Sequence, residues 1–173
     1  DGNVNTPTIP RLLTNADVNI IGTMGGVGIS ISNAGAAANF TFSSTDITGT
    51  AGGDGVNIAN STGTILFRAG DTTTTDDLVT LNTAGGDGID ISGTLAGAMF
   101  TFASADITNT ATGDGVRISD STGTILFSDG DMTTTDDLLI TNTGGGDGIA
   151  ISGTLAGANF TFSSTDITNT NTG

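Results

Sequence analysis

The sequence is organised by one four-residue motif, Gly-Asp-Gly followed by Val or Ile, that recurs at a fixed period. Copies begin at Gly53, Gly86, Gly113 and Gly146, and a degenerate copy begins at Gly26. Successive copies lie 27, 33, 27 and 33 residues apart, so the full period is 60 residues. Self-similarity on this scale predicts a solenoid, in which each repeat buries its apolar face only by stacking on its neighbours.

Each repeat carries three short apolar runs in which every second residue is apolar. Such alternation predicts strands with one buried face, and the Gly, Ser, Thr and Asp clusters between the runs predict turns. All eight phenylalanines fall in the second run and are expected to fill the interior: Phe40, Phe42, Phe67, Phe100, Phe102, Phe127, Phe160 and Phe162. No segment shows helical periodicity.

These features predict an all-β chain folded as a right-handed parallel β-helix. We expect three strands per coil, alternating 27- and 33-residue coils, and about six coils in all. Residues 1–25 form an atypical first coil and a partial N-terminal cap, and residues 26–173 form regular coils over 26–52, 53–85, 86–112, 113–145 and 146–172. The long coils are expected to differ by about six extra residues, bulging from one corner near 70–76 and 130–136.

An asparagine ends the third run of several repeats and is expected to point inward. Stacked amides can hydrogen-bond up such a column, so we interpret these residues as a structural ladder: Asn82, Asn109, Asn142 and Asn169. The register of the long repeats stays open, because Val79 and Leu81 alternate out of phase with Leu78 and Asn82.

The composition restricts the function classes. The chain has 18 Asp, no Glu or Lys and three Arg, which gives a net charge of −15. Without a basic stripe to neutralise phosphates, nucleic-acid binding is excluded, and no apolar run is long enough to insert into a membrane. The absence of cysteine fits a protein secreted across a bacterial envelope, and we therefore expect an extracellular or bacterial cell-surface location.

The acidic, cysteine-free repeats rich in Gly, Thr, Asp and Asn resemble the passenger regions of bacterial surface adhesins. Filamentous-haemagglutinin-like proteins, autotransporters and giant repeat adhesins share this architecture and composition, and the resemblance covers residues 16–173. It implies an extended stalk on the cell surface or a secreted fibre.

Two sets of aspartates are candidate metal ligands. The motif aspartates Asp54, Asp87, Asp114 and Asp147 should form a vertical column, and the favoured interpretation is an Asx-type turn in which each carboxylate accepts backbone N–H bonds between two glycines. A loosely bound cation column is the alternative.

Residues 85–91 match a calcium-binding nonapeptide pattern but lack its tandem nine-residue copies. Acidic residues also cluster at the corner insertions, where a solvated loop is favoured over calcium: Asp71, Asp76, Asp77, Asp129, Asp131, Asp136 and Asp137. We therefore expect no cofactor, with calcium as the alternative.

Two other functions are known for solenoids of this kind, namely polysaccharide cleavage and ice binding. Polysaccharide-cleaving β-helices need a positioned acid and base, whereas this chain lacks His, Lys, Glu and Tyr, and its acids simply repeat with the coil, so no catalytic residue is assigned. Ice binding would use outward T-x-T pairs on one strand column: Thr48 and Thr50, Thr108 and Thr110, Thr141 and Thr143, and Thr168 and Thr170.

The sequence thus predicts a structural and adhesive rod module of a bacterial extracellular fibre or surface adhesin, without catalysis. Ice binding is the main alternative, and a polysaccharide-acting enzyme or a phage appendage is a further one. We expect self-association end to end or covalent continuation into more coils, because the chain reads as a piece of a longer repeat protein or a filament subunit. The receptor or surface that it contacts is not specified by the sequence.

Overall fold

The computed structural model describes residues 12–22, 25–67, 78–81, 83–108, 110–128, 138–141 and 143–168. Every element in these segments is a strand, and every strand pairing is parallel, so the predicted all-β solenoid is confirmed. The strands are β1 (Leu12–Ile21), β2 (Ile29–Ser32), β3 (Asn39–Thr48), β4 (Val56–Ala59), β5 (Thr64–Phe67), β6 (Leu78–Leu81), β7 (Ile89–Ser92), β8 (Met99–Phe102), β9 (Ala105–Thr108), β10 (Val116–Ser119), β11 (Thr124–Phe127), β12 (Leu138–Thr141), β13 (Ile149–Ser152), β14 (Asn159–Phe162) and β15 (Thr165–Thr168).

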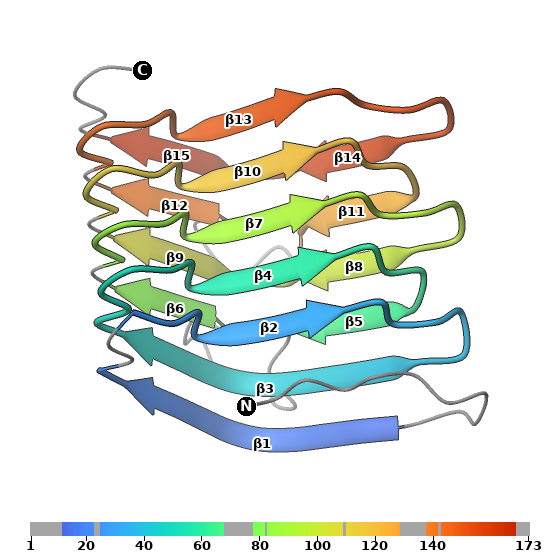
Figure 1. The fold of residues 1–173 in the computed structure, drawn as a ribbon, viewed down its shortest axis with the longest axis horizontal. Coiled ribbons are helices and arrows are strands. Elements are labelled where there is room, and N and C mark those ends of the chain that lie inside the picture. Colours follow the sequence, from blue (N-terminus) through green and yellow to red (C-terminus); the bar gives the residue numbers. More distant parts are fainter. Residues whose placement is uncertain are drawn as a thin grey trace.

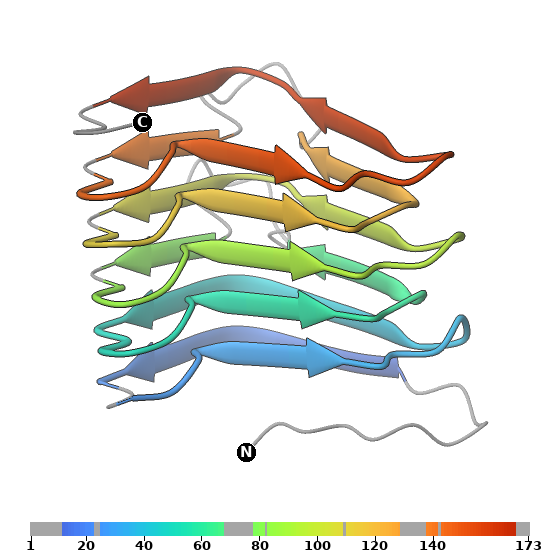
Figure 2. The same ribbon diagram turned by 45° about the horizontal axis from the view of Figure 1, so that its top comes forward.

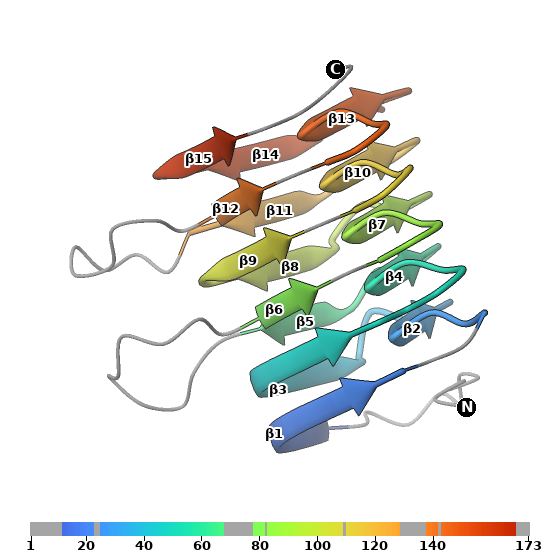
Figure 3. The ribbon, with the colours of Figure 1, turned by 90° about the vertical axis from the view of Figure 1, so that its left-hand side faces the viewer.

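The strands stack into two facing sheets (Figure 1). The first run of each repeat forms a five-stranded sheet in the order β13-β10-β7-β4-β2. The second and third runs together form a ten-stranded sheet, because β1 and β3 each contain both runs in one continuous strand. In later coils the two runs are separate strands, such as β5 and β6. The side view shows the successive rungs rising from β1 to the rung of β13, β14 and β15 (Figure 3).

The interior is built from columns of equivalent residues. Ile29, Val56, Ile89 and Val116 succeed one another in the five-stranded sheet and are all buried. In the second run, one column alternates between aromatic and aliphatic residues, since Ile65 and Ile125 pair with the flanking phenylalanines of neighbouring coils, namely Phe40, Phe100 and Phe160. The alternation of a large and a smaller side chain fills the space between rungs without overpacking.

The other second-run column is a continuous stack of phenylalanine rings. Its neighbouring ring centroids lie 4.7, 5.1, 4.8 and 5.0 Å apart, and the rings are within 11° of parallel: Phe42, Phe67, Phe102, Phe127 and Phe162. Phe67, Phe102 and Phe127 are fully buried, as predicted, whereas Phe162 of the last rung is only partly buried. The stack is a consequence of in-register parallel pairing, which places identical residues one above another.

The register of the long coils is settled by the pairing of β6. Leu78 pairs with Thr45 and Thr80 pairs with Ile47, and both Leu78 and Thr80 are fully buried. Thr80 therefore takes the place of an isoleucine in the third-run column, where its β-branched shape fits a strand. The predicted asparagine ladder of Asn82, Asn109, Asn142 and Asn169 lies outside the described residues.

The two coil types differ at two corners, and the expectation of a single six-residue insertion is corrected. Ten residues separate β5 from β6, whereas two separate β8 from β9. Where the chain passes from the five-stranded to the ten-stranded sheet, four residues separate β4 from β5, whereas six separate β7 from β8. Figure 2 shows this second kind of connection reaching out further on every second coil. The long coil therefore has more residues than the short coil at one corner and fewer at the other.

Candidate functional site

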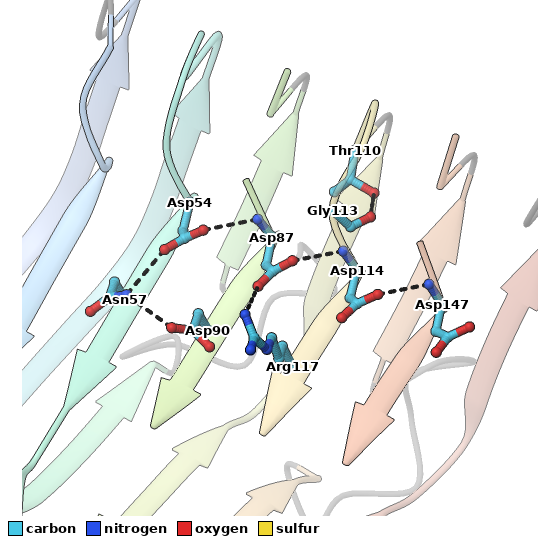
Figure 4. A network of polar contacts seen from close by, with 9 residues as sticks. All are labelled: Asp54, Asn57, Asp87, Asp90, Thr110, Gly113, Asp114, Arg117 and Asp147. Carbon is cyan, nitrogen blue, oxygen red and sulfur yellow. Dashed lines mark hydrogen bonds and ion pairs between the residues drawn. The ribbon is translucent and has the colours of Figure 1, made fainter. Parts of the chain in front are cut away.

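The motif aspartates line one corner, just before β4, β7, β10 and β13 of the five-stranded sheet (Figure 4). The backbone N–H of Asp87 donates to Oδ1 of Asp54 at 2.9 Å. The N–H of Asp114 donates to Oδ1 of Asp87 at 2.7 Å, and the N–H of Asp147 donates to Oδ1 of Asp114 at 2.7 Å. The predicted Asx-type turn is thus wrong, because these carboxylates accept backbone N–H bonds from the next coil and not from their own turn. The carboxylates of Asp54, Asp87 and Asp114 each join two coils, and we call the column of Asp54, Asp87, Asp114 and Asp147 the aspartate ladder.

The glycines of the motif leave room for this ladder. A Cβ on Gly86 would lie 2.5 Å from Oδ1 of Asp54 and 2.5 Å from the carbonyl carbon of Gly53. A Cβ on Gly88 would collide with the side chain of Ile107 inside the coil. The motif Gly-Asp-Gly is therefore explained by close approach on both sides of the aspartate.

Three further polar side chains gather beside the ladder. Asn57 of β4 donates from Nδ2 to Oδ2 of Asp54 at 3.0 Å and to Oδ2 of Asp90 at 3.1 Å. Nη1 of Arg117 on β10 lies 4.0 Å from Oδ2 of Asp87. Figure 4 shows Asn57, Asp90 and Arg117 side by side on consecutive strands, next to the ladder. The cluster therefore places three carboxylates around one amide and one guanidinium.

Burial dominates the electrostatics of this cluster. Burial raises the pKa of Asp87 from 3.8 to about 6; the N–H of Asp114 opposes this, and the charges of Asp54, Asp114 and Asp90 add to it. Burial also raises the pKa of Asp90, with the negative charge of Asp54 adding to the rise and Arg117 opposing it. The charged form is thus disfavoured at Asp87 in the ladder and at Asp90 beside it.

The arrangement does not form a metal centre among the residues that the structure describes. Within them, no three acidic side chains are grouped closely enough to hold a metal ion. The candidate cation ligands Asp54, Asp87, Asp114 and Asp147 are instead spread along the ladder, each at its own rung. The acidic corner residues Asp71, Asp76, Asp77, Asp129, Asp131, Asp136 and Asp137 lie outside the described residues.

The predicted outward T-x-T array is wrong for the second threonine of each described pair. Thr48, Thr108, Thr141 and Thr168 are at least partly exposed, but Thr50, Thr110 and Thr143 are buried. Between Thr48 and Thr50 the chain turns at Gly49, whose φ of +71° lies in the left-handed region, and this turn directs Thr50 inward. On that strand column Thr48, Thr108, Thr141 and Thr168 alternate irregularly with Ile21 and Leu81, which pair in the same register. Thr170 lies outside the described residues.

The buried threonines form a second polar column that the sequence interpretation missed. Thr110 and Thr143 donate to the carbonyls of Gly113 and Gly146, three residues further on. Thr50 and Thr83 occupy the same place, and their buried hydroxyls have no hydrogen-bond partner among the described residues. The signal was available, because a threonine stands three residues before every full copy of the motif.

A third polar column, at the opposite edge, was also missed. The hydroxyl of Ser61 accepts from the N–H of Ala34 at 3.1 Å and donates to the carbonyl of Ala59 at 2.9 Å. The preceding turn position has positive φ in successive coils: Asn33, Asn60, Gly93, Asp120 and Gly153. Asn, Asp and Gly tolerate this conformation best, so their recurrence after each first run was the sequence signal.

Comparison of the chain with protein-family models, with curated proteins and with solved structures gave no match. In the described part of the chain, no helix is long and apolar enough to cross a membrane. The assignment of the fold as a parallel solenoid therefore depends on the strand pairing and the sequence repeat alone.

Proposed function

We propose that this chain is a structural and adhesive rod module of a bacterial extracellular fibre or cell-surface adhesin. The observation that carries the proposal is the uninterrupted ladder of in-register parallel strands, in which the same residue columns continue through every described rung. Such a stack spans distance with a repeating surface and grows by adding rungs.

The cross-rung polar bonds support a load-bearing role. Oδ1 of Asp54, Asp87 and Asp114 each hold the next coil, in addition to the backbone pairing of the strands. Separating two rungs would break these bonds, the strand ladder and the phenylalanine stack together. The absence of cysteine fits export through an oxidising compartment.

The end rung supports stacking on further coils. Ile151 and Ile167 of the last described rung are 45% and 43% exposed, whereas their equivalents Ile118 and Ile140 one rung below are fully buried. Another rung, from the same chain or from a second copy, would cover this apolar layer.

Location and mechanics together test the proposal. Immunogold labelling of intact source cells should place the protein outside the cell, and single-molecule pulling along the rod should show successive rungs resisting force. Label confined to the cytoplasm of permeabilised cells would contradict the extracellular assignment. Unfolding at negligible force would contradict the load-bearing role.

A further inference from the structure

Every full copy of the motif places an aspartate directly before a glycine, and this dipeptide rearranges readily in unfolded chains. The glycine amide nitrogen attacks Cγ of the aspartate, because no side chain on the glycine hinders it. An N–Cγ bond then closes a succinimide ring, while the carboxyl OH and the amide proton leave as water. Water reopens the ring at either carbonyl and gives aspartate or isoaspartate. The dipeptides of the full motif copies are Asp54-Gly55, Asp87-Gly88, Asp114-Gly115 and Asp147-Gly148.

The fold requires this reactive dipeptide at each rung. The aspartate supplies the carboxylate that accepts the N–H of the next coil. The glycine after it has no room for a side chain, because a Cβ on Gly55, Gly88 or Gly115 would collide with an inward side chain of the third run. A bulkier following residue would slow ring closure by hindering the nitrogen. That protection is not open to this chain, so any protection must come from the bonding of the dipeptide.

The attacking nitrogen is held by the next coil. The N–H of Gly55 donates to the carbonyl oxygen of Asp87 at 2.9 Å, and the N–H of Gly88 donates to that of Asp114 at 2.9 Å. Both glycines are buried. The nitrogen attacks only after its proton passes to a base in the solvent, and amide protons paired in a strand ladder become accessible only when the structure opens. Paired coils therefore keep the nitrogen unreactive.

The attacked carboxyl group is held by the next coil as well. Oδ1 of Asp54 accepts the N–H of Asp87, and Oδ1 of Asp87 accepts the N–H of Asp114. Turning either carboxyl group toward its own glycine would break this bond, so the alignment that ring closure needs is not reached in the stacked coils. A neutral carboxyl group reacts faster than a carboxylate, and the raised pKa of Asp87 would therefore favour the reaction there if its side chain were free.

We propose that the aspartate ladder suppresses succinimide formation at the Asp-Gly bonds of the motif, and that these bonds become modification sites only where two coils separate. Isoaspartate lengthens the main chain by one atom just before a strand of the five-stranded sheet, so the in-register pairing of that rung would not form again. A coil that has opened and reacted would thus be prevented from stacking. The proposal goes beyond the rod function and holds wherever the rod is located.

Two asparagine variants separate the effect of the ladder from that of strand pairing. Asparagine before glycine forms the same ring but releases ammonia, and the product has a higher mass that mass spectrometry detects. Asp114→Asn keeps an Oδ1 acceptor for the N–H of Asp147. Ser92→Asn is the matched control on the outward side of β7, where the N–H of Gly93 donates to the carbonyl of Ser119 at 3.0 Å. In the control the nitrogen is paired, but the side chain lies outside the ladder.

The rate of ammonia loss is measured for each variant in neutral buffer and is divided by the rate for the same variant unfolded in guanidinium chloride. Circular dichroism establishes that both variants are folded in buffer. The relative rate of Asp114→Asn should be at least several-fold lower than that of Ser92→Asn. Equal relative rates, whether fast or slow, would overturn the proposal, because the ladder would then add nothing to the pairing of the backbone.

A second experiment tests local opening in a chain that keeps its aspartates. Gly86→Ala crowds Oδ1 of Asp54, the atom that accepts the N–H of Asp87. After prolonged incubation of the folded protein, chymotryptic peptides are compared with synthetic isoaspartyl standards. Isoaspartate at Asp54 should rise above the parent level, and it should rise more than at Asp114 of the same variant. No rise at Asp54, or an equal rise at both residues, would overturn the proposal that the ladder protects each rung.

Discussion

Two columns of identical residues run through this solenoid with opposite energetic consequences. The phenylalanine stack and the aspartate ladder both arise because in-register strands place equivalent residues on successive rungs. Stacking buries ring surface and adds attraction at each rung, whereas burial of the stacked carboxylates, with repulsion between them as a smaller cause, raises the pKa of Asp87 to about 6. A repeated residue thus multiplies its favourable or unfavourable interaction with its own copies. The aspartates are tolerated because Asp54, Asp87 and Asp114 each accept a backbone N–H from the next coil.

The largest expected effect comes from a gap in the middle of the phenylalanine stack. Phe102→Ala should lower the free energy of unfolding by about 3–5 kcal/mol, because a fully buried ring with neighbours on both sides is removed. Chemical denaturation followed by circular dichroism measures the change. The matched variant Phe162→Ala, at the partly exposed end of the stack, should cost clearly less. Equal costs would show that the stack does not act as a cooperative column.

The next effect comes from crowding the aspartate ladder. Gly86→Ala should destabilise by about 1–3 kcal/mol, because the added methyl group meets Oδ1 of Asp54 and the backbone of Gly53. Gly26→Ala is the control, since a Cβ at this equivalent position of the lowest copy meets nothing within 4 Å. If both variants melted like the parent, close packing would not explain the glycine of the motif.

Acidification should stabilise the fold through the ladder. The folded pKa of Asp87 lies above its ordinary value of 3.8, so its contribution is fully present below about pH 3.8 and is lost as the pH rises through about 6. The free energy of unfolding should therefore increase as the pH falls from 7 to 4. Asp87→Asn keeps the acceptor for the N–H of Asp114 and should stabilise the protein at pH 7 while flattening this dependence.

The control for the pH experiment is Asp166→Asn, which removes an exposed carboxylate on β15, away from the ladder. Its pH profile should follow that of the parent. A profile in which Asp87→Asn and the parent remain parallel from pH 4 to pH 7 would contradict the assigned role of Asp87.

The smallest expected effect is that of divalent cations. The melting temperature should change little on adding a chelator, and calcium should act no differently from magnesium at equal ionic strength, because screening of the net charge is general. A calcium-specific, saturable rise in the melting temperature would instead indicate a true site, since specific binding stabilises the native state by mass action.

The sequence predicted the columns well and the corners poorly, for a physical reason. Alternation with a two-residue period determines which strand residues face inward, so Phe67 and Phe100 could be placed from the repeat alone. At a corner, one residue with positive φ changes the direction of the chain. The two-residue alternation then no longer shows which of the following residues face inward. The inward Thr50, which follows Gly49, is the clearest case.

The aspartate ladder was predicted as a column but not in its bonding. A local turn and a bond to the next coil use the same residue types, and spacing along the chain does not distinguish them. The distinction depends on how closely Asp54 and Asp87 approach across rungs, which follows from the packing of Gly86 against the coil below.

The alternation of phenylalanine and isoleucine over β3, β5, β8, β11 and β14 has a consequence for inheritance. Loss or duplication of a single coil by recombination would keep the strand pairing but would set two phenylalanines or two isoleucines against each other, crowding or hollowing that layer. A 60-residue exchange restores the alternation and the charge pattern in one event. The pair of coils is therefore the unit by which such a gene can change length without disturbing the packing of the interior, and length variants of this protein should differ by multiples of that pair.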